Sequence, residues 1–218
     1  TNLYKALALL QCAAFGTLTR EIAEEGGIES VLWAGPRRSG KPVRLVLKAH
    51  FEDMVYTVEV GLPQPAEAAF VTEPLVKEES LVVRHGRRDV MMMERKGPVV
   101  TVRNEDGERE MHKDAVLPSE TALSAFRDGA RYPELEIVRR EISEWRLYHD
   151  FRTDAGSPIR QPCHAIATPT LSADGRDLAA VLATLFVIRR DTADLANAVD
   201  DAFPGALLHA HANAGTCA

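Results

Sequence analysis

Hydrophobic residues recur at helical spacing from the first residues of the chain. Four of them fall at i, i+4, i+7 and i+11 on one face of an α-helix over residues 1–15: Leu3, Leu7, Leu10 and Ala14. A shorter helix over residues 18–25 is predicted to end at Gly26 and Gly27. Because no capping residue opens the first helix and no signal-peptide pattern is present, we expect further sequence upstream.

Between residues 28 and 112 the hydrophobic period changes to two, which indicates β-strands. Charged residues at Glu78 and Glu79 divide one long run into two expected strands. Turns at Lys96-Gly97-Pro98 and Asp106-Gly107 favour hairpins. The expected strands cover residues 30–34, 43–48, 54–60, two runs within 70–84, 90–94, 99–103 and 108–111. Short strands joined by tight turns predict an antiparallel meander.

From residue 120 to residue 205 the pattern is helical. One helix over residues 134–148 carries Leu135, Val138, Ile142 and Trp145 on one face. Further helices are expected from about Asp177 and after Thr192, which is a capping residue. Residues 209–218 have no periodicity, and we expect a disordered tail. The predicted fold is a mixed α+β lobe of the α/β class, with a helix, an antiparallel sheet and a helical segment in that order.

Composition narrows the class of protein. The chain has 218 residues, 45% hydrophobic and 27% charged, with a net charge of −6, which excludes a collagen, a coiled-coil rod and a disulfide-framed miniprotein. The longest apolar run, residues 178–188, is shorter than the roughly 20 residues of a membrane span. Three cysteines, Cys12, Cys163 and Cys217, are an odd and widely spaced set. We therefore expect a reduced, cytoplasmic protein without membrane partners.

The segment from Gly35 to Lys41 partly matches the motif of a phosphate-binding loop. Its sequence GPRRSGK matches most of the motif, but Pro42 stands where a Ser or Thr hydroxyl would bind Mg²⁺. The loop should also lead into a helix, whereas a strand is expected from residue 43. We interpret the segment as a basic hairpin turn.

Six other segments carry a resemblance, in a shared order, to a known family. They are TNLYKAL (1–7), VLWAGP (31–36), LPSETALS (117–124), WRLYHDFRTD (145–154), TPTLSADGRDLA (168–179) and DDAFPG (200–205). Together they span most of the chain up to Leu208. The series resembles the RecF/OLD-like predicted ATPases, whose heads are related to those of ABC and SMC proteins.

The resemblance implies that residues 1–208 are part of a P-loop NTPase head. Residues 1–15 would be the helix after the Walker A loop, with Thr1 as the Mg²⁺ ligand and Thr1 and Asn2 contacting ATP. The Gly-rich loop and its Lys would lie upstream, and the signature motif, Walker B carboxylates and switch His downstream. The parent would be an ATPase in DNA repair, recombination or defence, a homodimer that sandwiches ATP between its heads. This polypeptide alone would be inactive.

Two alternatives come from other classes. The chain could be a non-enzymatic α+β interaction module that binds a partner through its meander. It could also be a phosphoesterase that uses His149, Asp150 and Asp154, beside Tyr148 and Arg152. Neighbouring helical residues point in different directions, so a structural role at the end of the helix is favoured for that cluster.

Lesser candidates have plainer interpretations. His209 and His211 could form a metal pair, but a solvated tail is favoured. Cys163-His164 lacks the second half of a zinc pattern. Asp174-Gly175 reads as a turn before a helix, and Met91, Met92 and Met93 as residues that pack against the sheet. Eight basic residues around the predicted turns could bind a nucleic-acid backbone, although solvated turns are favoured: Arg37, Arg38, Lys41, Arg44, Arg87, Arg88, Arg95 and Lys96.

Overall fold

The computed structural model describes residues 2–32, 44–63, 70–86, 88–148, 152–190, 192–210, 212–213 and 215–217. The chain divides into two compact units, Thr1–Trp145 and Arg146–Ala218. We call them unit 1 and unit 2 and describe each by itself. The boundary falls inside residues 1–208, which the family resemblance assigns to a single head.

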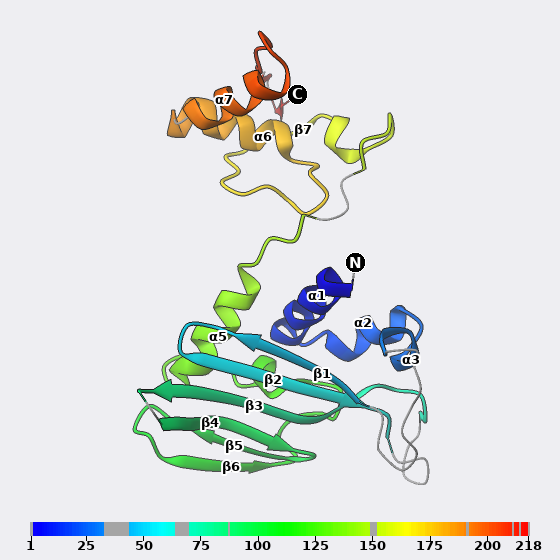
Figure 1. Ribbon diagram of the computed structural model, residues 1–218, viewed down its shortest axis with the longest axis vertical. Coiled ribbons are helices and arrows are strands. Elements are labelled where there is room, and N and C mark those ends of the chain that lie inside the picture. The colour runs from blue at the N-terminus through cyan, green and yellow to red at the C-terminus, as the bar shows by residue number, and fades with distance from the viewer. Residues whose placement is uncertain are drawn as a thin grey trace. The chain divides into compact units, whose positions relative to one another are not determined.

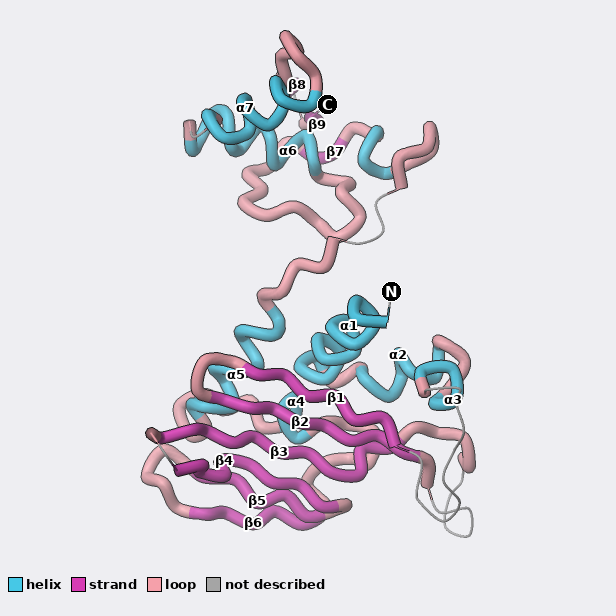
Figure 2. The backbone as a smooth tube through the Cα atoms, in the orientation of Figure 1, coloured by secondary structure: helices cyan, strands magenta, loops and turns pink. Residues whose placement is uncertain are grey.

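Unit 1 contains a six-stranded antiparallel sheet in the order β1-β2-β3-β4-β5-β6, so each strand pairs with the next one in sequence (Figures 1 and 2). The predicted meander and the mixed α+β class are therefore confirmed. The strands are β1 (Arg44–His50), β2 (Met54–Gly61), β3 (Leu75–His85), β4 (Arg88–Lys96), β5 (Val99–Arg103) and β6 (Arg109–Lys113).

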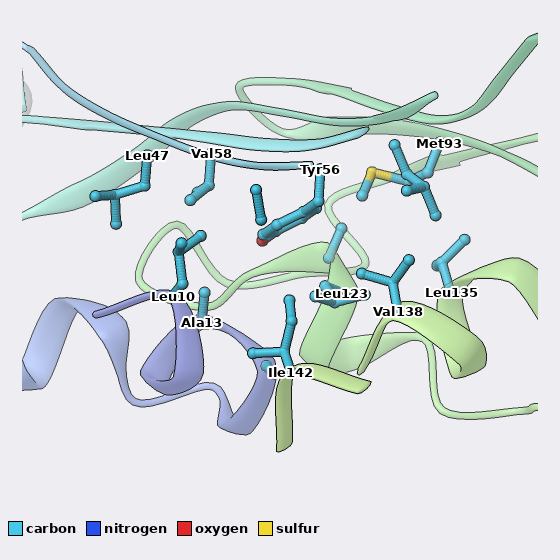
Figure 3. Close-up of a cluster of buried hydrophobic side chains, with 14 of the residues drawn as sticks. Leu10, Ala13, Leu47, Tyr56, Val58, Met93, Leu123, Leu135, Val138 and Ile142 are labelled. Atoms are coloured by element: carbon cyan, nitrogen blue, oxygen red, sulfur yellow. The ribbon is translucent and has the colours of Figure 1, made fainter. Parts of the chain in front are cut away.

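Helices α1 (Asn2–Phe15), α4 (Ala122–Ala125) and α5 (Pro133–Ser143) cover one face of this sheet and close the core of unit 1. Figure 3 shows Leu10 and Ala13 of α1 and Ile142 of α5 pointing toward Tyr56 and Val58 of β2. All five of these residues are buried. The alternation predicted for β2 is confirmed, because Tyr56, Val58 and Val60 all face this core.

Helix α1 (Asn2–Phe15) confirms the first predicted helix, but its buried face differs from the predicted one. The buried residues are Leu9, Leu10, Ala13 and Ala14, all in the second half of the helix. Leu3, which was expected on the apolar face, is 70% exposed. In the first half of the helix, Ala6 is only partly buried against the core. Helix α2 (Leu18–Glu24) confirms the second prediction.

The strand predicted at residues 30–34 is wrong within the described part, because Ile28–Val31 form the short helix α3. Gly27 before it has φ +87°, a conformation that favours glycine and redirects the chain. Ile28 enters the core, and β1 pairs along its whole length with β2 instead. The turn at Gly35–Lys41 lies outside the described residues.

The break predicted near Glu78 and Glu79 is also wrong, because β3 runs through both residues without interruption. Glu79 is only 2% exposed and faces the core. A charged residue can occupy that position because polar groups of other elements meet it there, as described below. β-Bulges in the pairing of β3 with both neighbours accommodate the irregular pattern.

Two helices follow the sheet in unit 1, α4 (Ala122–Ala125) and α5 (Pro133–Ser143). Leu135, Val138 and Ile142 of α5 are fully buried, as predicted, and Trp145 packs against the core. Helix α5 ends five residues before the predicted end at residue 148, with Glu144 as its C-cap.

Unit 2 consists of short elements. They are η1 (Pro158–Arg160), β7 (Cys163–His164), α6 (Leu178–Ala183), which continues as the π-helix η2 (Thr184–Arg189), then α7 (Ala193–Ala202), β8 (Ala212–Asn213) and β9 (Thr216–Cys217). The expectation of a wholly disordered tail over residues 209–218 is corrected, because β8 and β9 lie there. Strand β9 pairs with both β7 and β8. Main-chain hydrogen bonds do not depend on the hydrophobic periodicity that the tail lacks.

None of the helices in the described ranges is long and apolar enough to cross a membrane.

Candidate functional site

The start of α1 is the site to which the family resemblance directs attention. Thr1, the expected Mg²⁺ ligand, lies outside the described residues. Asn2, the expected ATP contact, is the first residue of α1 and is exposed, as are Leu3, Tyr4 and Lys5. The side chain of Lys5 is paired with Glu25, at 3.3 Å between Nζ and Oε2. The first turn of α1 therefore stands on the surface of unit 1.

The second half of α1 is anchored in three ways. Its leucines and alanines enter the core, and Gln11 donates from Nε2 to the carbonyl oxygen of Trp145 at 2.9 Å. The Thr121 hydroxyl donates to the carbonyl oxygen of Ala13 at 2.6 Å. These contacts tie the helix to the loop before α4 and to the end of α5.

A buried polar cluster, which we call the Glu79 cluster, joins β2, β3 and β4 to the segment 117–124. Glu79 accepts hydrogen bonds from the Tyr56 hydroxyl at 2.9 Å and from the backbone N–H groups of Ala122 at 2.6 Å and Leu123 at 2.9 Å. Burial raises the pKa of the Glu79 carboxyl, and these three donors oppose that shift. Burial and the nearby Glu79 carboxylate hold the pKa of Tyr56 well above its usual value.

Arg95 completes the Glu79 cluster from β4, where it lies directly opposite Glu79 in the strand register. It is 1% exposed and donates to the carbonyl oxygens of Gly97, Leu117 and Glu120. Its positive charge favours the ionised form of Glu79. The cluster thus fixes onto the sheet residues 117–124, one of the six segments that carry the resemblance. It is a structural device, since its donors and acceptors are used by the protein itself.

Sequence reasoning placed Tyr56 on one face of its strand but missed its bond to Glu79, and it placed Arg95 among the residues of turns. A charged pair at corresponding positions of two neighbouring strands, within otherwise hydrophobic alternation, is the signal that could have found them.

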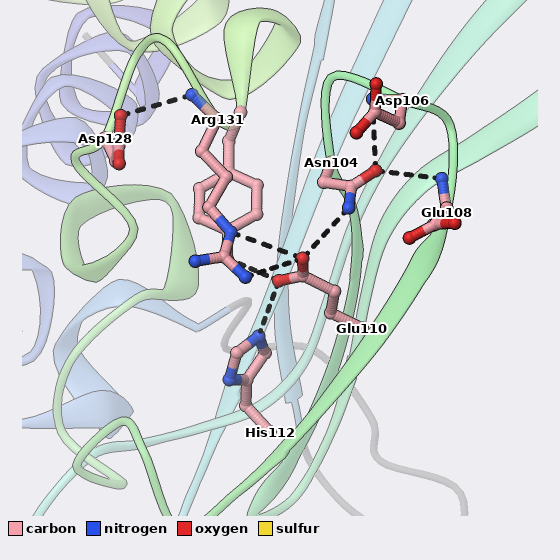
Figure 4. Close-up of polar contacts among 8 residues, drawn as sticks. Asn104, Asp106, Glu108, Glu110, His112, Asp128 and Arg131 are labelled. Atoms are coloured by element: carbon pink, nitrogen blue, oxygen red, sulfur yellow. Dashed lines mark hydrogen bonds and ion pairs between the residues drawn. The ribbon is translucent and has the colours of Figure 1, made fainter.

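A second polar cluster, the Glu110 cluster, lies on β6 at the edge of the sheet (Figure 4). Glu110 accepts from Arg131 Nη2 at 2.7 Å, from the Tyr132 hydroxyl at 2.8 Å and from Asn104 Nδ2 at 3.0 Å. Arg131 and then Tyr132 lower the pKa of Glu110 to about 2. Burial and Glu110 raise the pKa of Tyr132 to about 12. His112 Nε2 is buried 3.4 Å from Glu110 Oε2, without a hydrogen bond.

The phosphoesterase candidates are not assembled in the part of the chain that is described. His149 and Asp150 lie outside it. Asp154 is exposed, and it accepts from Arg152 and from the backbone N–H of Gly156 in a local turn. Among the described residues, no group of three or more His, Cys, Asp or Glu is arranged to hold a metal ion. The Tyr148 hydroxyl donates to the carbonyl oxygen of Leu171 at 3.0 Å.

Asp174-Gly175 forms a turn before α6, as predicted. Gly175 has φ +73°, and the Ser172 hydroxyl lies 2.9 Å from Asp174 Oδ1 and 2.7 Å from Asp177 Oδ1. The backbone N–H of Arg176 and then the Ser172 hydroxyl lower the pKa of Asp174. These bonds are internal to the turn and explain its composition.

The basic residues weighed as a nucleic-acid surface are paired, buried or exposed in different ways where they are described. Arg44 is paired with Glu59 and Glu78, both at 2.8 Å, and Lys96 with Glu94 at 2.6 Å. Arg95 is buried, and Arg88 is exposed on β4. Outside the described residues lie Arg37, Arg38, Lys41 and Arg87.

The remaining candidates have ordinary positions. Met92 and Met93 are buried in the core from β4, which confirms the packing interpretation. His209 is exposed, whereas His211 lies outside the described residues. Cys163-His164 forms β7 and borders a cavity of about 620 Å³ in unit 2. Other residues around this cavity are Pro158, Gln161, Ile166, Arg176 and Thr216.

Comparison with family models, with curated proteins and with solved structures finds no match to this chain in any of the three.

Proposed function

We propose that the chain is part of the ATP-binding head of a RecF/OLD-like ATPase. The observation that carries the proposal is the asymmetry of α1, which is anchored by its second half and exposed at its first turn. A helix start carries partial positive charge and N–H donors, which suit the phosphates of ATP. The family resemblance puts Thr1 and Asn2 at that position, after a Gly-rich loop.

Two further features support this proposal. An antiparallel sheet follows α1, as a head of this type requires, and the Glu79 cluster fixes the family-like segment 117–124 to that sheet and to α1. These contacts would hold the start of α1 at a constant distance from the sheet while nucleotide binds. Phosphoryl transfer depends on such positioning more than on covalent chemistry by the protein.

The residues of this chain would supply only some of the contacts that a Mg²⁺–ATP site needs. Mg²⁺ neutralises phosphate charge and prefers six oxygen ligands in octahedral geometry. The Thr1 hydroxyl would be one of these ligands, and the Asn2 amide would be a polar contact to ATP beside it. The described residues add no acidic ligand set. ATP hydrolysis is therefore proposed for the parent protein, as a homodimer with ATP between two heads, and not for this polypeptide alone.

The test uses the protein extended by the residues that its gene encodes before Thr1. Titration with a fluorescent ATP analogue and Mg²⁺ should show binding by the extended protein. Thr1→Ala should weaken that binding by roughly 10- to 150-fold, the equivalent of one bond to a charged group. Thr153→Ala, a change at an exposed threonine of unit 2, should leave the affinity unchanged.

Two results would contradict the proposal. One is an upstream coding sequence without a Gly-rich stretch that ends in Gly-Lys directly before Thr1. The other is binding of the ATP analogue that Thr1→Ala leaves intact.

The interaction-module alternative is favoured by one specific observation, the continuous core of unit 1. Hydrophobic residues from α1 to α5 form a single buried cluster. A self-sufficient module should unfold in one sharp thermal transition without any flanking sequence, whereas a piece of a head should aggregate or melt broadly. Calorimetry of the chain as given distinguishes the two.

A further inference from the structure

Two of the three cysteines of the chain meet in unit 2, although they lie far apart in sequence. Cys163 on β7 is the direct register partner of Cys217 on β9 in an antiparallel pair. Side chains of directly opposed residues project from the same face of a sheet. The wide separation of these two cysteines in the sequence gives no sign of this pairing.

The backbone spacing at this pair suits a disulfide. Ala165 donates its N–H to the carbonyl oxygen of Gly215 at 3.1 Å, which marks Ala165 and Gly215 as a hydrogen-bonded pair. Such pairs alternate along antiparallel strands, so Cys163 and Cys217 form the next one, with Cα atoms about 5.5 Å apart. Disulfides span Cα separations of about 4.4–6.8 Å. Both cysteines are free thiols here.

The two thiols differ in their access to solvent. Cys163 is half-buried and borders the cavity of about 620 Å³, which Gln161 and Arg176 also line. Cys217 is 3% exposed and does not border that cavity. A small reagent in the cavity therefore reaches Cys163 first. The Arg176 guanidinium and the Gln161 amide are suitable donors for the carboxylates of a peptide-like disulfide.

We propose that Cys163 and Cys217 form a thiol–disulfide exchange site for low-molecular-weight disulfides of the oxidised glutathione type. The Cys163 thiolate attacks one sulfur of the reagent, forms a mixed disulfide and releases one reduced thiol. The Cys217 thiolate then attacks the Cys163 sulfur, forms the Cys163–Cys217 bond and releases the second thiol. The protein loses two protons and two electrons, and the reagent disulfide takes them up to become two thiols. This inference is independent of the proposed function.

Cys12 supplies an internal control within the same chain. It lies in α1 of unit 1, is half-buried, and its Sγ is hydrogen-bonded with Thr17. Burial raises the pKa of its thiol, which lowers the fraction of reactive thiolate at neutral pH.

The experiment incubates the folded full chain with oxidised and reduced glutathione, followed by acid quenching, alkylation and mass spectrometry. We expect an intact mass lower by two hydrogens before alkylation, a cross-linked peptide that contains Cys163 and Cys217, and alkylation at Cys12. The Cys163–Cys217 link should exceed each link to Cys12 by at least about tenfold, because the sheet holds the two thiols at high effective concentration. Prior unfolding in urea should reduce this preference to the several-fold bias that the shorter loop between Cys163 and Cys217 gives by itself.

Single variants test the order of the two steps. Cys217→Ser should stop at the glutathione adduct of Cys163, and Cys163→Ser should leave Cys217 unmodified on the same time scale. Cys12→Ser should leave the cross-link unchanged. Equal yields of all three links in the folded chain, or the same preference in urea, would overturn the proposal. So would modification of Cys217 at the same rate in the presence and absence of Cys163, and this comparison needs only the folded parent and one variant.

Discussion

The two units of this protein reach their folds by different means. In unit 1, hydrophobic residues of strands β1 to β5 and of helices α1 to α5 form one buried cluster. In the described part of unit 2, the buried hydrophobic residues are Ala180 and Cys217. Large apolar side chains of unit 2 remain exposed instead, among them Val187, Ile188, Phe203 and Leu207.

In unit 2, local hydrogen bonds from side chains hold the backbone in place, whereas a hydrophobic core does so in unit 1. The buried Ser157 hydroxyl donates to the carbonyl oxygen of Arg152, and the Thr184 hydroxyl donates to that of Ala180 at 2.7 Å. Bonds of this kind add only about 1 kcal/mol each. The comparison teaches that unit 1 should be the more stable of the two units, whereas unit 2 should gain much from a cross-link or a partner. Four predictions test this difference, from the largest expected effect to the smallest.

The first concerns the Glu79 cluster in unit 1. Arg95→Met removes the cation opposite Glu79 and the donors to Leu117 and Glu120, and it leaves the buried Glu79 carboxylate without an opposite charge. We expect a loss of about 3–5 kcal/mol in the free energy of unfolding. Urea denaturation followed by tryptophan fluorescence reports on this unit, because Trp33 and Trp145 both lie in residues 1–145.

Arg88→Met is the matched control for that variant, since Arg88 lies on the same strand but is exposed. It should change the free energy of unfolding by less than about 0.5 kcal/mol. Equal effects of the two variants would show that the Glu79 cluster does not hold unit 1 together.

The second prediction concerns the disulfide proposed for unit 2. Closing the loop between Cys163 and Cys217 restricts the unfolded chain, and we expect stabilisation of about 2–4 kcal/mol. Hydrogen exchange of peptides within residues 163–217 should slow by roughly 30- to 900-fold on oxidation. Peptides of β2 in unit 1 should exchange at the same rate in both states. Similar slowing in both units would show that they do not respond separately.

The third prediction compares two helix starts, one in each unit. The Thr121 hydroxyl of unit 1 accepts from the Ser124 N–H and donates to Ala13, whereas Thr192 makes no side-chain capping bond to α7. Thr121→Ala should cost about 1–2 kcal/mol and Thr192→Ala less than about 0.5 kcal/mol. Urea denaturation measures the first, and hydrogen exchange of α7 the second. A larger cost at Thr192 would contradict the view of unit 2 as loosely held.

Sequence reasoning succeeded where hydrophobic period alone decides the structure. Residues 54–60 alternate strictly because one face of β2 meets the core, and Leu135, Val138 and Ile142 follow the helical period for the same reason. The order of the sheet also follows, because short turns join neighbouring antiparallel strands.

It failed where long-range contacts override the local pattern. Glu79 looked like a break in a strand, since its partners Tyr56, Ala122 and Leu123 come from distant segments. Ser30 and Val31 were expected to begin a strand over residues 30–34, yet they end the short helix α3, which follows the turn at Gly27. The pairing of β9 with β7 involves main-chain groups that no side-chain pattern reports.

The last prediction concerns the Glu110 cluster, at the exposed edge of unit 1. The folded-state pKa of Glu110, about 2, lies below the ordinary value of 4.5. The unfolded chain therefore binds a proton more readily, and the stability that Glu110 contributes is present above pH 4.5 and is lost as the pH falls toward 2. Glu110→Gln should lower the urea midpoint at pH 7 and have a smaller effect at pH 3. Glu108→Gln, a change at an exposed neighbour, should have little effect at either pH. The urea midpoints of the unmodified chain and of Glu110→Gln could instead differ by the same amount at pH 7 and at pH 3. That result would mean that the ionised Glu110 carboxylate does not stabilise this edge, because its titration is the one that differs between the two proteins.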